Sequence, residues 1–216
     1  MSATSDAVTP DHFAYLARRT GGDDPFLKEL KGAALAAGLP EIWVAPEQAS
    51  FFQIALAAIG AKTVVEVGTL AGSTVIALAR ALADGGHVYT CEIEPRHAAF
   101  AREWIACFDV KERITVHVGD ARKSLATLVD GSVDAILIDV DKKGYVVYLR
   151  HALRLLRRGG LLFADNAFAF GQLLSPAPTD PDVPTIRAFN DLVAHTKELQ
   201  AVIVPLGDGF WFGVRR

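Results

Sequence analysis

The chain alternates short apolar segments rich in β-branched residues with segments of helical periodicity, and this alternation constrains the fold most. The apolar segments predict strands at Thr63–Val67, His87–Glu92, Ile114–Val118, Asp134–Asp139 and Gly160–Ala164. The segments between them predict helices at Ser73–Ala83, Pro95–Phe108, Arg122–Leu128 and Tyr145–Leu156, the last ended by Gly159–Gly160. Strands that alternate with helices indicate an α/β fold, in which helices cover both faces of a parallel sheet.

The pattern changes after the fifth predicted strand. A proline-rich segment, 172–184, precedes a predicted helix at Thr185–Glu198 and two predicted strands at Ala201–Pro205 and Phe210–Val214. The turn Leu206–Gly209 between these strands is typical of a hairpin. We therefore expect a mostly parallel sheet that ends in a C-terminal antiparallel hairpin, with extra N-terminal helices within Asp11–Ala37.

Length and charge limit the classes to which the chain can belong. Its 216 residues predict a single domain over 1–216, with an N-terminal helical cap at 1–45 and a core at 46–216. The formal net charge of −3 offers no basic surface to nucleic acid or to an anionic membrane. No apolar segment reaches the roughly 20 residues of a membrane-spanning helix, and the first twelve residues lack the features of a signal peptide. A cytoplasmic protein is expected.

Acidic residues follow consecutive predicted strands. Because the carboxyl ends of parallel strands meet at one edge of a sheet, we expect these residues to line a ligand site there. The loop after the first strand contains Gly68 and Gly72, which allow the backbone to approach a ligand closely. It is not a Gly-x-Gly-x-x-Gly motif and it lacks the lysine of a phosphate-binding loop, so a nicotinamide cofactor and ATP are disfavoured. Glu92, about 20 residues further on, is suited to bind the hydroxyls of a ribose; the alternative is a solvated acid.

A second group of oxygen ligands follows the fourth and fifth predicted strands. Asp139, Asp165 and Asn166 make an anionic, oxygen-rich set that suits Mg²⁺. The alternative for Asp165 or Asn166 taken singly is helix N-capping. Lys142 stands three residues after Asp139, where a cation and a cationic cofactor would disfavour its charged form and prepare it to take a proton. The alternative is a lysine paired with the neighbouring carboxylates. The scattered histidines predict no zinc site, and Cys91 and Cys107 are expected in the core.

From about Val44 to the C-terminus, the motifs resemble one known family. The chain contains VVEVGTLAGST, YTCEIEP, VGDA, ILIDVDKKGYVVYL, LLRRGGLLFADN and PLGDGFWFGVRR. These are similar to motifs of the cation-dependent, S-adenosylmethionine-dependent O-methyltransferases of the caffeoyl-CoA and catechol type. The resemblance implies a Rossmann-like class I methyltransferase fold with seven strands, and a homodimer. It also implies transfer of a methyl group to a hydroxyl of a catechol-like small molecule, with a divalent cation, Mg²⁺, Mn²⁺ or Ca²⁺, chelating the diol.

The resemblance also implies roles for individual residues. Five would surround the methionine part of the cofactor: Val44, Glu66, Gly68, Thr69 and Thr74. Glu92 would bind the ribose, Ala121 would lie by the adenine, and Asp141 would meet the amino group; Asp120 and Asp139 are also expected among the cofactor-binding residues. Asp139, Asp165 and Asn166 would bind the cation. Lys142, assisted by Asp139, would be the catalytic base.

The acceptor side departs from the family pattern. Gly72-Ser73-Thr74 stands where the family usually has Gly-Tyr-Ser, and Phe168-Ala169-Phe170-Gly171 where it often has Trp and Gly. Four aromatic residues are candidates to stack on an acceptor, with core or subunit-interface roles as the alternative: Trp43, Phe168, Phe170 and Trp211. The segment 172–184 either covers the site or only connects elements. Two other functions stay open, a metal-independent methyltransferase and a non-catalytic cofactor-binding protein.

Overall fold

The alternating strands build one seven-stranded sheet in the order β3-β2-β1-β4-β5-β7-β6. The computed structural model describes residues 9–216. The strands are β1 Thr63–Val67, β2 His87–Glu92, β3 Ile114–Val118, β4 Val133–Ile138, β5 Leu156–Ala164, β6 Leu199–Val204 and β7 Phe210–Arg215. The first five run parallel, whereas β7 pairs antiparallel with both β5 and β6. The predicted Rossmann-like α/β fold with a closing hairpin is confirmed.

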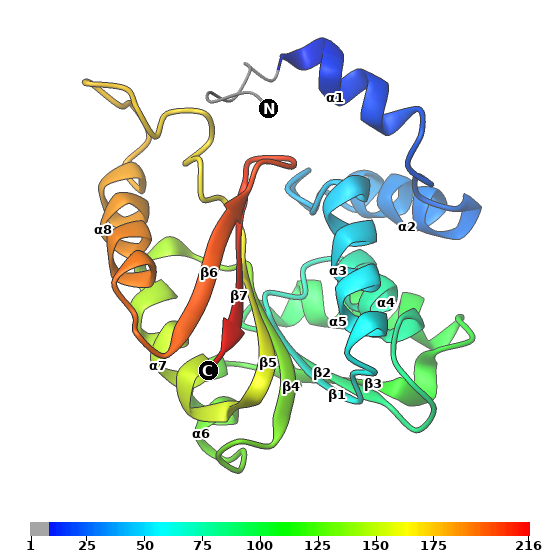
Figure 1. The fold of residues 1–216 in the computed structure, drawn as a ribbon. Coiled ribbons are helices and arrows are strands. Elements are labelled where there is room, and N and C mark those ends of the chain that lie inside the picture. The colour runs from blue at the N-terminus through cyan, green and yellow to red at the C-terminus, as the bar shows by residue number, and fades with distance from the viewer. Residues whose placement is uncertain (1–8) are drawn as a thin grey trace.

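Helices cover both faces of this sheet (Figure 1). One face carries α3 Pro46–Ala58, α4 Ser73–Arg80 and α5 Pro95–Ala106, and the other carries α6 Ala121–Ala126, α7 Tyr145–Leu155 and α8 Val183–Ala194. The 3₁₀ turns are η1 Lys111–Arg113 and η2 Lys142–Gly144. The two N-terminal helices are α1 Pro10–Ala17 and α2 Pro25–Ala36, and α1 buries none of its residues. Residues 1–8 of the predicted cap lie outside the described residues, and the division at residue 45 stays a prediction.

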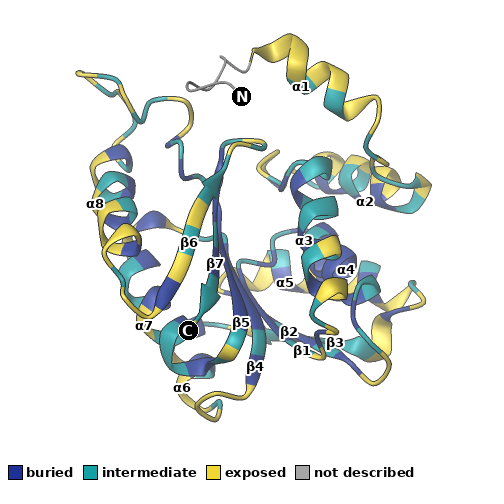
Figure 2. Ribbon diagram, in the orientation of Figure 1, coloured by how far each residue is buried: buried dark blue, intermediate teal, exposed yellow. Residues whose placement is uncertain are grey.

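The central strands are buried on both faces, which explains their continuous apolar sequences (Figure 2). Successive side chains of a strand point to opposite faces, so neighbouring residues join different core clusters. Val64 and Leu137 pack in the cluster that includes Phe52, whereas Val65 and Ile136 pack in the other. The sheet is therefore held between two apolar layers, and its strand ends are fixed in space.

Several elements differ from their predicted bounds by a few residues, and two elements differ more. Helix α3 was not predicted, because its apolar residues do not form a single stripe and buried Gln48 interrupts them. Strand β5 begins at Leu156 rather than at Gly160, so Gly159–Gly160 do not end α7. A Cβ at residue 160 would lie 3.0 Å from the carbonyl oxygen of Asp134, and the glycine allows this close approach of β4.

A smaller correction concerns one of the two cysteines. Cys91 is buried as expected, but Cys107 is exposed at the end of α5. No helix in the part of the chain that the structure describes combines the length and hydropathy needed to cross a bilayer.

Candidate active site

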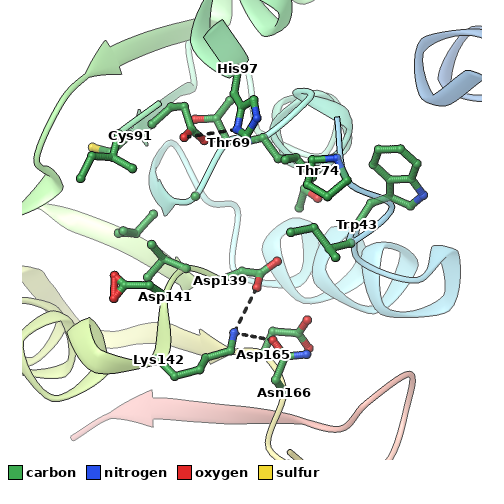
Figure 3. Close-up of a pocket in the computed structure, with 18 of the residues that line it drawn as sticks. Trp43, Thr69, Thr74, Cys91, His97, Asp139, Asp141, Lys142, Asp165 and Asn166 are labelled. Carbon is green, nitrogen blue, oxygen red and sulfur yellow. Dashed lines mark hydrogen bonds and ion pairs between the residues drawn. The ribbon is translucent and has the colours of Figure 1, made fainter. Parts of the chain in front are cut away.

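A cavity of about 600 Å³ opens at the carboxyl ends of the parallel strands. Its walls come from the loops after β1, β2, β3, β4 and β5, from the segment before α3, and from the β6–β7 turn. Figure 3 shows Thr69, Thr74 and His97 on one side of this space and Asp139 and Lys142 on the other. The cavity thus joins the two groups of residues that the sequence singled out.

The glycine loop approaches the cavity with its backbone. Gly68 has φ +103°, and a Cβ there would overlap the carbonyl oxygen of Asp139, so only glycine fits. Gly72, with φ +92°, is the N-cap of α4, and Ser73 and Thr74 in the first turn line the cavity. The N-terminus of α4, with its unpaired amide groups, therefore faces the site.

Glu92 holds the glycine loop as well as lining the cavity. Its Oε2 accepts a hydrogen bond from the Leu70 amide at 2.8 Å, and its Oε1 accepts one from the Glu94 amide at 2.9 Å. His97 Nδ1 lies 3.8 Å from Oε1. Two backbone amides thus fix the carboxylate and leave it further lone pairs for a ligand.

Glu66 is fully buried behind this loop. Its Oε2 accepts a hydrogen bond from Thr90 at 2.5 Å, and Thr90 contacts Thr69, whereas Oε1 has no partner among the described residues. Burial raises the pKa of Glu66 well above its usual range, with smaller contributions from the charges of Asp139 and Glu92. Glu66 does not line the cavity, so its direct contact with a cofactor is not supported.

This burial predicts a pH-dependent effect on stability. An acid whose pKa is raised by folding stabilises the fold fully only below its unfolded pKa, about 4.3, and that stability is lost as the pH rises towards the folded pKa. Glu66→Gln removes this loss. We expect its free energy of unfolding, relative to the wild type, to increase between pH 5 and pH 8, by up to about 1.4 kcal/mol per pH unit. Urea unfolding at each pH measures it, with exposed Glu103→Gln as control. Parallel pH curves for Glu66→Gln and the wild type would contradict a buried neutral acid.

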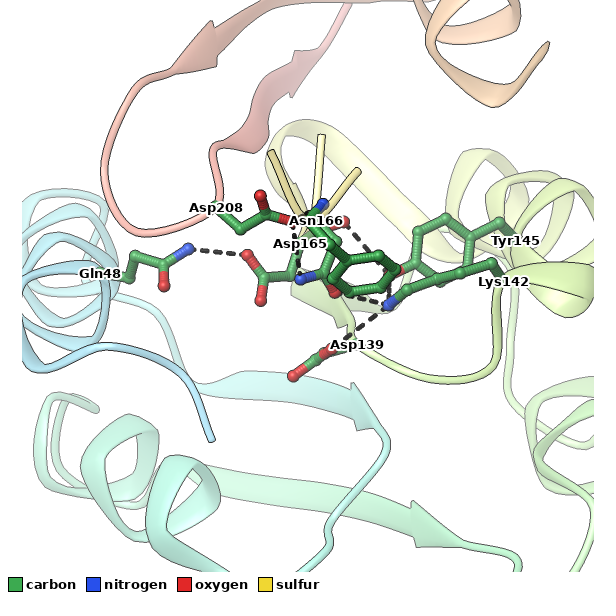
Figure 4. Close-up of polar contacts among 8 residues, drawn as sticks. Gln48, Asp139, Lys142, Tyr145, Asp165, Asn166 and Asp208 are labelled. Carbon is green, nitrogen blue, oxygen red and sulfur yellow. Dashed lines mark hydrogen bonds and ion pairs between the residues drawn. The ribbon is translucent and has the colours of Figure 1, made fainter. Parts of the chain in front are cut away.

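Asp139, Lys142, Asp165 and Asn166 meet at the other end of the cavity (Figure 4). Lys142 Nζ donates to Asn166 Oδ1 at 2.5 Å and to the Tyr145 hydroxyl at 2.7 Å, and lies 3.7 Å from Asp139 Oδ1. The spacing of three residues does bring Asp139 and Lys142 together, and the element that begins at Lys142 is a 3₁₀ turn.

Burial sets the electrostatics of this group. It raises the pKa of Asp165 to about 7, with a further increase from the charge of Asp139, and it also raises the pKa of Asp139. Burial likewise raises the pKa of Tyr145 well above its usual range, so its hydroxyl keeps its proton and donates to the carbonyl oxygen of Asp165 at 3.2 Å. Two carboxyl groups are therefore held in an environment that disfavours their charge unless a cation compensates it.

The chemistry of these donors fits a hard divalent cation. Two carboxyl groups and an amide oxygen are ligands of the kind that Mg²⁺ takes while it keeps other positions for water and substrate. Within residues 9–216 there is no cluster of three or more His, Cys, Asp or Glu side chains that could hold a metal ion. The candidate set has only two acids, and its third member is Asn166. Neither Asp165 nor Asn166 is the N-cap of a helix, because β5 ends just before Asp165 and no helix begins after these two residues.

Most of the predicted site residues line the cavity. Those that do are Trp43, Gly68, Thr69, Thr74, Glu92, Ala121, Asp139, Asp141, Lys142, Asp165, Asn166 and Phe170. Val44, Glu66 and Asp120 are not among the lining residues: Val44 packs in the core, and Asp120 caps α6 and pairs with Arg122.

Two aromatic candidates for the acceptor wall are corrected. Trp211 is buried in the core, where its Nε1 donates to Asn190 at 2.7 Å. Phe168 packs against Gly209 of the hairpin turn rather than lining the cavity. Cys91 lines the cavity, but burial raises the pKa of its thiol to about 11, so the thiol is neutral near pH 7.

Three supporting residues were not predicted. Gln48 of α3 donates from Nε2 to Asp165 Oδ1 at 2.7 Å and accepts from the Ala45 amide, Tyr145 contacts Lys142, and Asp208 of the β6–β7 turn contacts Asn166. The only sequence signal for Asp208 was the hairpin turn that contains it.

Comparison with known proteins identifies the family. The family model described as "O-methyltransferase" matches residues 18–216. A "Catechol O-methyltransferase" of Mycobacterium tuberculosis is 36% identical over 94% of this chain and 93% of its own length, and a "Probable caffeoyl-CoA O-methyltransferase 2" of Dictyostelium discoideum is 31% identical over 76% and 73%. The crystal structure of the O-methyltransferase from Bacillus cereus in complex with SAH superposes with a TM-score of 0.85 at 32% identity, covering 94% of this chain and 96% of that one.

The fold and the strand-edge cavity define a Rossmann-like methyltransferase, and the matches narrow this class. The chain belongs to the O-methyltransferase family that includes catechol and caffeoyl-CoA O-methyltransferases. The family resemblance seen in the sequence, and the prediction of an S-adenosylmethionine-dependent O-methyltransferase, are confirmed.

Proposed function

We propose that this protein transfers a methyl group from S-adenosylmethionine to one hydroxyl of a catechol-like aromatic diol, with a divalent cation at Asp139, Asp165 and Asn166 and with Lys142 as the base. The observation that carries the proposal is the single cavity in which a glycine loop with Glu92 faces this oxygen-rich group. A cofactor and an acceptor bound at these two ends would meet beside Lys142.

The cofactor end has the features that a sulfonium nucleoside requires. Gly68, Thr69 and Thr74 offer backbone and hydroxyl groups to the methionine part, and Glu92 accepts hydrogen bonds from the ribose. Ala121 borders the adenine, and Asp141 provides a carboxylate for the amino group. The SAH complex of the Bacillus cereus relative supports binding of a cofactor of this kind by the family.

The cation end prepares the acceptor. A divalent cation held by Asp139, Asp165 and Asn166 would stabilise the deprotonated form of an aromatic hydroxyl. Gln48 donates to the Asp165 carboxylate and Tyr145 donates to the backbone carbonyl of the same residue, so both its side chain and its backbone are held in place. Burial raises the pKa of both carboxyl groups, which means that their negative charge is unfavourable in the fold. A bound cation would compensate that charge.

Lys142 takes the proton of the attacking hydroxyl. Its side chain is buried, and Tyr145 and Asn166 fix Nζ at the border of the cavity. Nζ thus lies where it could accept a proton from an acceptor hydroxyl bound beside it. The remaining catalysis is alignment of the phenolate oxygen with the methyl group.

The acceptor wall is built from Trp43 and Phe170, which offer aromatic faces to a ring. A small aromatic diol fits the names of the catechol relatives, and a caffeoyl ester fits those of the others. The predicted homodimer and the predicted covering role of segment 172–184 stay predictions.

The test is methyl transfer from labelled S-adenosylmethionine to catechols, caffeoyl esters and hydroxylated flavonoids, with Mg²⁺ and with EDTA. We expect label on vicinal diols only, and none when one hydroxyl is already methylated, because chelation needs both oxygens. Transfer that survives EDTA would favour a metal-independent methyltransferase. Tight binding of S-adenosylhomocysteine without transfer to any diol would favour a non-catalytic cofactor-binding protein.

A further inference from the structure

We infer that Asp208, in the β6–β7 turn, is a positioning residue that holds the Asn166 amide with its oxygen towards the cation site and fixes Phe170 at the acceptor wall. The inference rests on the proposed function for the identity of that site. It assigns to the hairpin turn a part in the chemistry, beyond closing the sheet.

The Asp208 carboxylate receives three hydrogen bonds from one loop. Oδ2 accepts from Asn166 Nδ2 at 3.2 Å and from the Phe170 amide at 2.8 Å, and Oδ1 accepts from the Gly171 amide at 3.1 Å. Figure 4 shows Asn166 between Asp208 on one side and Lys142 on the other. A single carboxylate therefore ties a proposed cation ligand to Phe170, an aromatic residue that lines the same cavity.

The chemistry of an amide makes this contact decisive. Only the carbonyl oxygen of an asparagine can bind a hard cation, since the amide nitrogen offers only donors. A carboxylate accepts and cannot donate, and an ammonium donates and cannot accept. Asp208 at Nδ2 and Lys142 at Oδ1 therefore select one of the two flip states of Asn166, with the oxygen turned to the site.

Of these two contacts, that of Asp208 is independent of catalysis. In the proposed reaction Oδ1 of Asn166 serves as a cation ligand and Lys142 exchanges protons with the acceptor, so their mutual contact changes. Asp208 contacts Nδ2 and not the oxygen that would bind the cation, so the proposed reaction does not require this contact to change. It can hold the orientation throughout turnover.

Backbone strain in the same loop points to the same anchor. Asn166, Ala169 and Phe170 have φ of 61°, 54° and 58°, in the left-handed region that costs non-glycine residues of order 1–3 kcal/mol each. The hairpin turn compensates through the carbonyls of Asp208 and Gly209, which accept from the Phe168 and Ala167 amides at 2.8 Å each. The Asp208 side chain completes this support at Phe170, whose ring lies 5.9 Å from Lys142 Nζ.

The experiment measures cation binding apart from activity. Mn²⁺ affinity is determined by electron paramagnetic resonance for the full chain saturated with S-adenosylhomocysteine, for the wild type, Asp208→Ala, Asp208→Asn and the exposed control Asp84→Ala. We expect Asp208→Ala to weaken Mn²⁺ binding by about 10–100-fold, the usual effect of losing a group that orients a ligand. S-adenosylhomocysteine affinity should be unchanged, and the acceptor KM should rise because Phe170 loses its anchor.

Asp208→Asn distinguishes positioning from simple support of the fold. Its amide oxygen can still accept from Asn166 and Phe170, but its nitrogen cannot accept from Gly171, and either flip state is open to it. Mn²⁺ affinity between those of the wild type and Asp208→Ala is therefore expected.

Three results decide the matter. Wild-type Mn²⁺ affinity in folded Asp208→Ala would overturn the inference, and so would an equal loss of Mn²⁺ and S-adenosylhomocysteine affinity in Asp208→Asn, which would show general damage. Absence of Mn²⁺ binding in the wild type would instead overturn the metal part of the proposed function.

Discussion

Asp165→Ala is expected to lower kcat for methyl transfer about 10³-fold, the effect of losing several kcal/mol of stabilisation of a phenolate. The carboxyl group is buried beside Gln48 and Asp139, and its loss removes one of the two acids proposed to hold the cation. The expected loss is in the chemical step, because the substitution leaves unchanged the glycine loop and Glu92, which are proposed to bind the cofactor at the other end of the cavity.

The same substitution should not destabilise the metal-free protein at alkaline pH. Folding raises the pKa of Asp165 to about 7, so its contribution to stability is full below its unfolded pKa, about 3.9, and is lost as the pH rises through 7. In EDTA at pH 8, Asp165→Ala should therefore unfold at the same or a higher urea concentration than the wild type.

Activity, Mn²⁺ affinity and urea midpoint together check this prediction, with exposed Asp191→Ala as a matched control. Full turnover by Asp165→Ala would remove this residue from the cation site. Lost turnover together with a much lower urea midpoint would assign Asp165 to the stability of the fold instead.

Lys142→Ala is expected to lower kcat by about 10²–10⁴-fold, the range for loss of a positioned general base. Lys142→Arg should be nearly as inactive, because arginine keeps the positive charge beside Asp139 but does not release a proton at ordinary pH. The pair of variants thus separates proton transfer from charge compensation. Affinity for S-adenosylhomocysteine should be nearly unchanged in both.

Single-turnover rates across pH 6–9 measure this effect, and exposed Lys143→Ala is the control from the adjacent position. The Lys142→Ala and Lys142→Arg rates should lie far below the wild-type rate at every pH in this range, whereas the Lys143→Ala rate should follow the wild type. Substantial activity in Lys142→Arg would mean that the charge of residue 142 matters and its proton does not.

Features that depend on local sequence patterns, such as the strands and their acidic ends, were predicted well. The bounds of β1, β2 and β3 are as predicted, because each strand is a run rich in β-branched residues with glycine or polar residues at its ends. The acidic strand ends were also predictable, since parallel strands deliver their carboxyl ends to one edge. Helix α3 was missed because its burial, on the sheet and against α4, blurs the amphipathic pattern.

Contacts between distant segments account for what the sequence did not predict. Gln48 contacts Asp165 across 117 residues of sequence, and Asp208 contacts Asn166 across 42. Local sequence patterns cannot predict contacts between residues so far apart. Trp211 and Phe168 were predicted at the acceptor wall because they are aromatic. In the fold they pack elsewhere, with Trp211 hydrogen-bonded to Asn190 and Phe168 in contact with Gly209.

The antiparallel insertion of β7 also has a consequence for the order of events on the ribosome. Synthesised after every other strand, β7 nonetheless occupies an interior position, between β5 and β6. A nascent chain can pair β1 to β5 as they emerge, but it cannot seat β6 beside them until β7 has followed. Asp208 reaches Asn166 only through that last insertion. The contact that supports Asn166 at the proposed cation site is therefore made only when the sheet is completed.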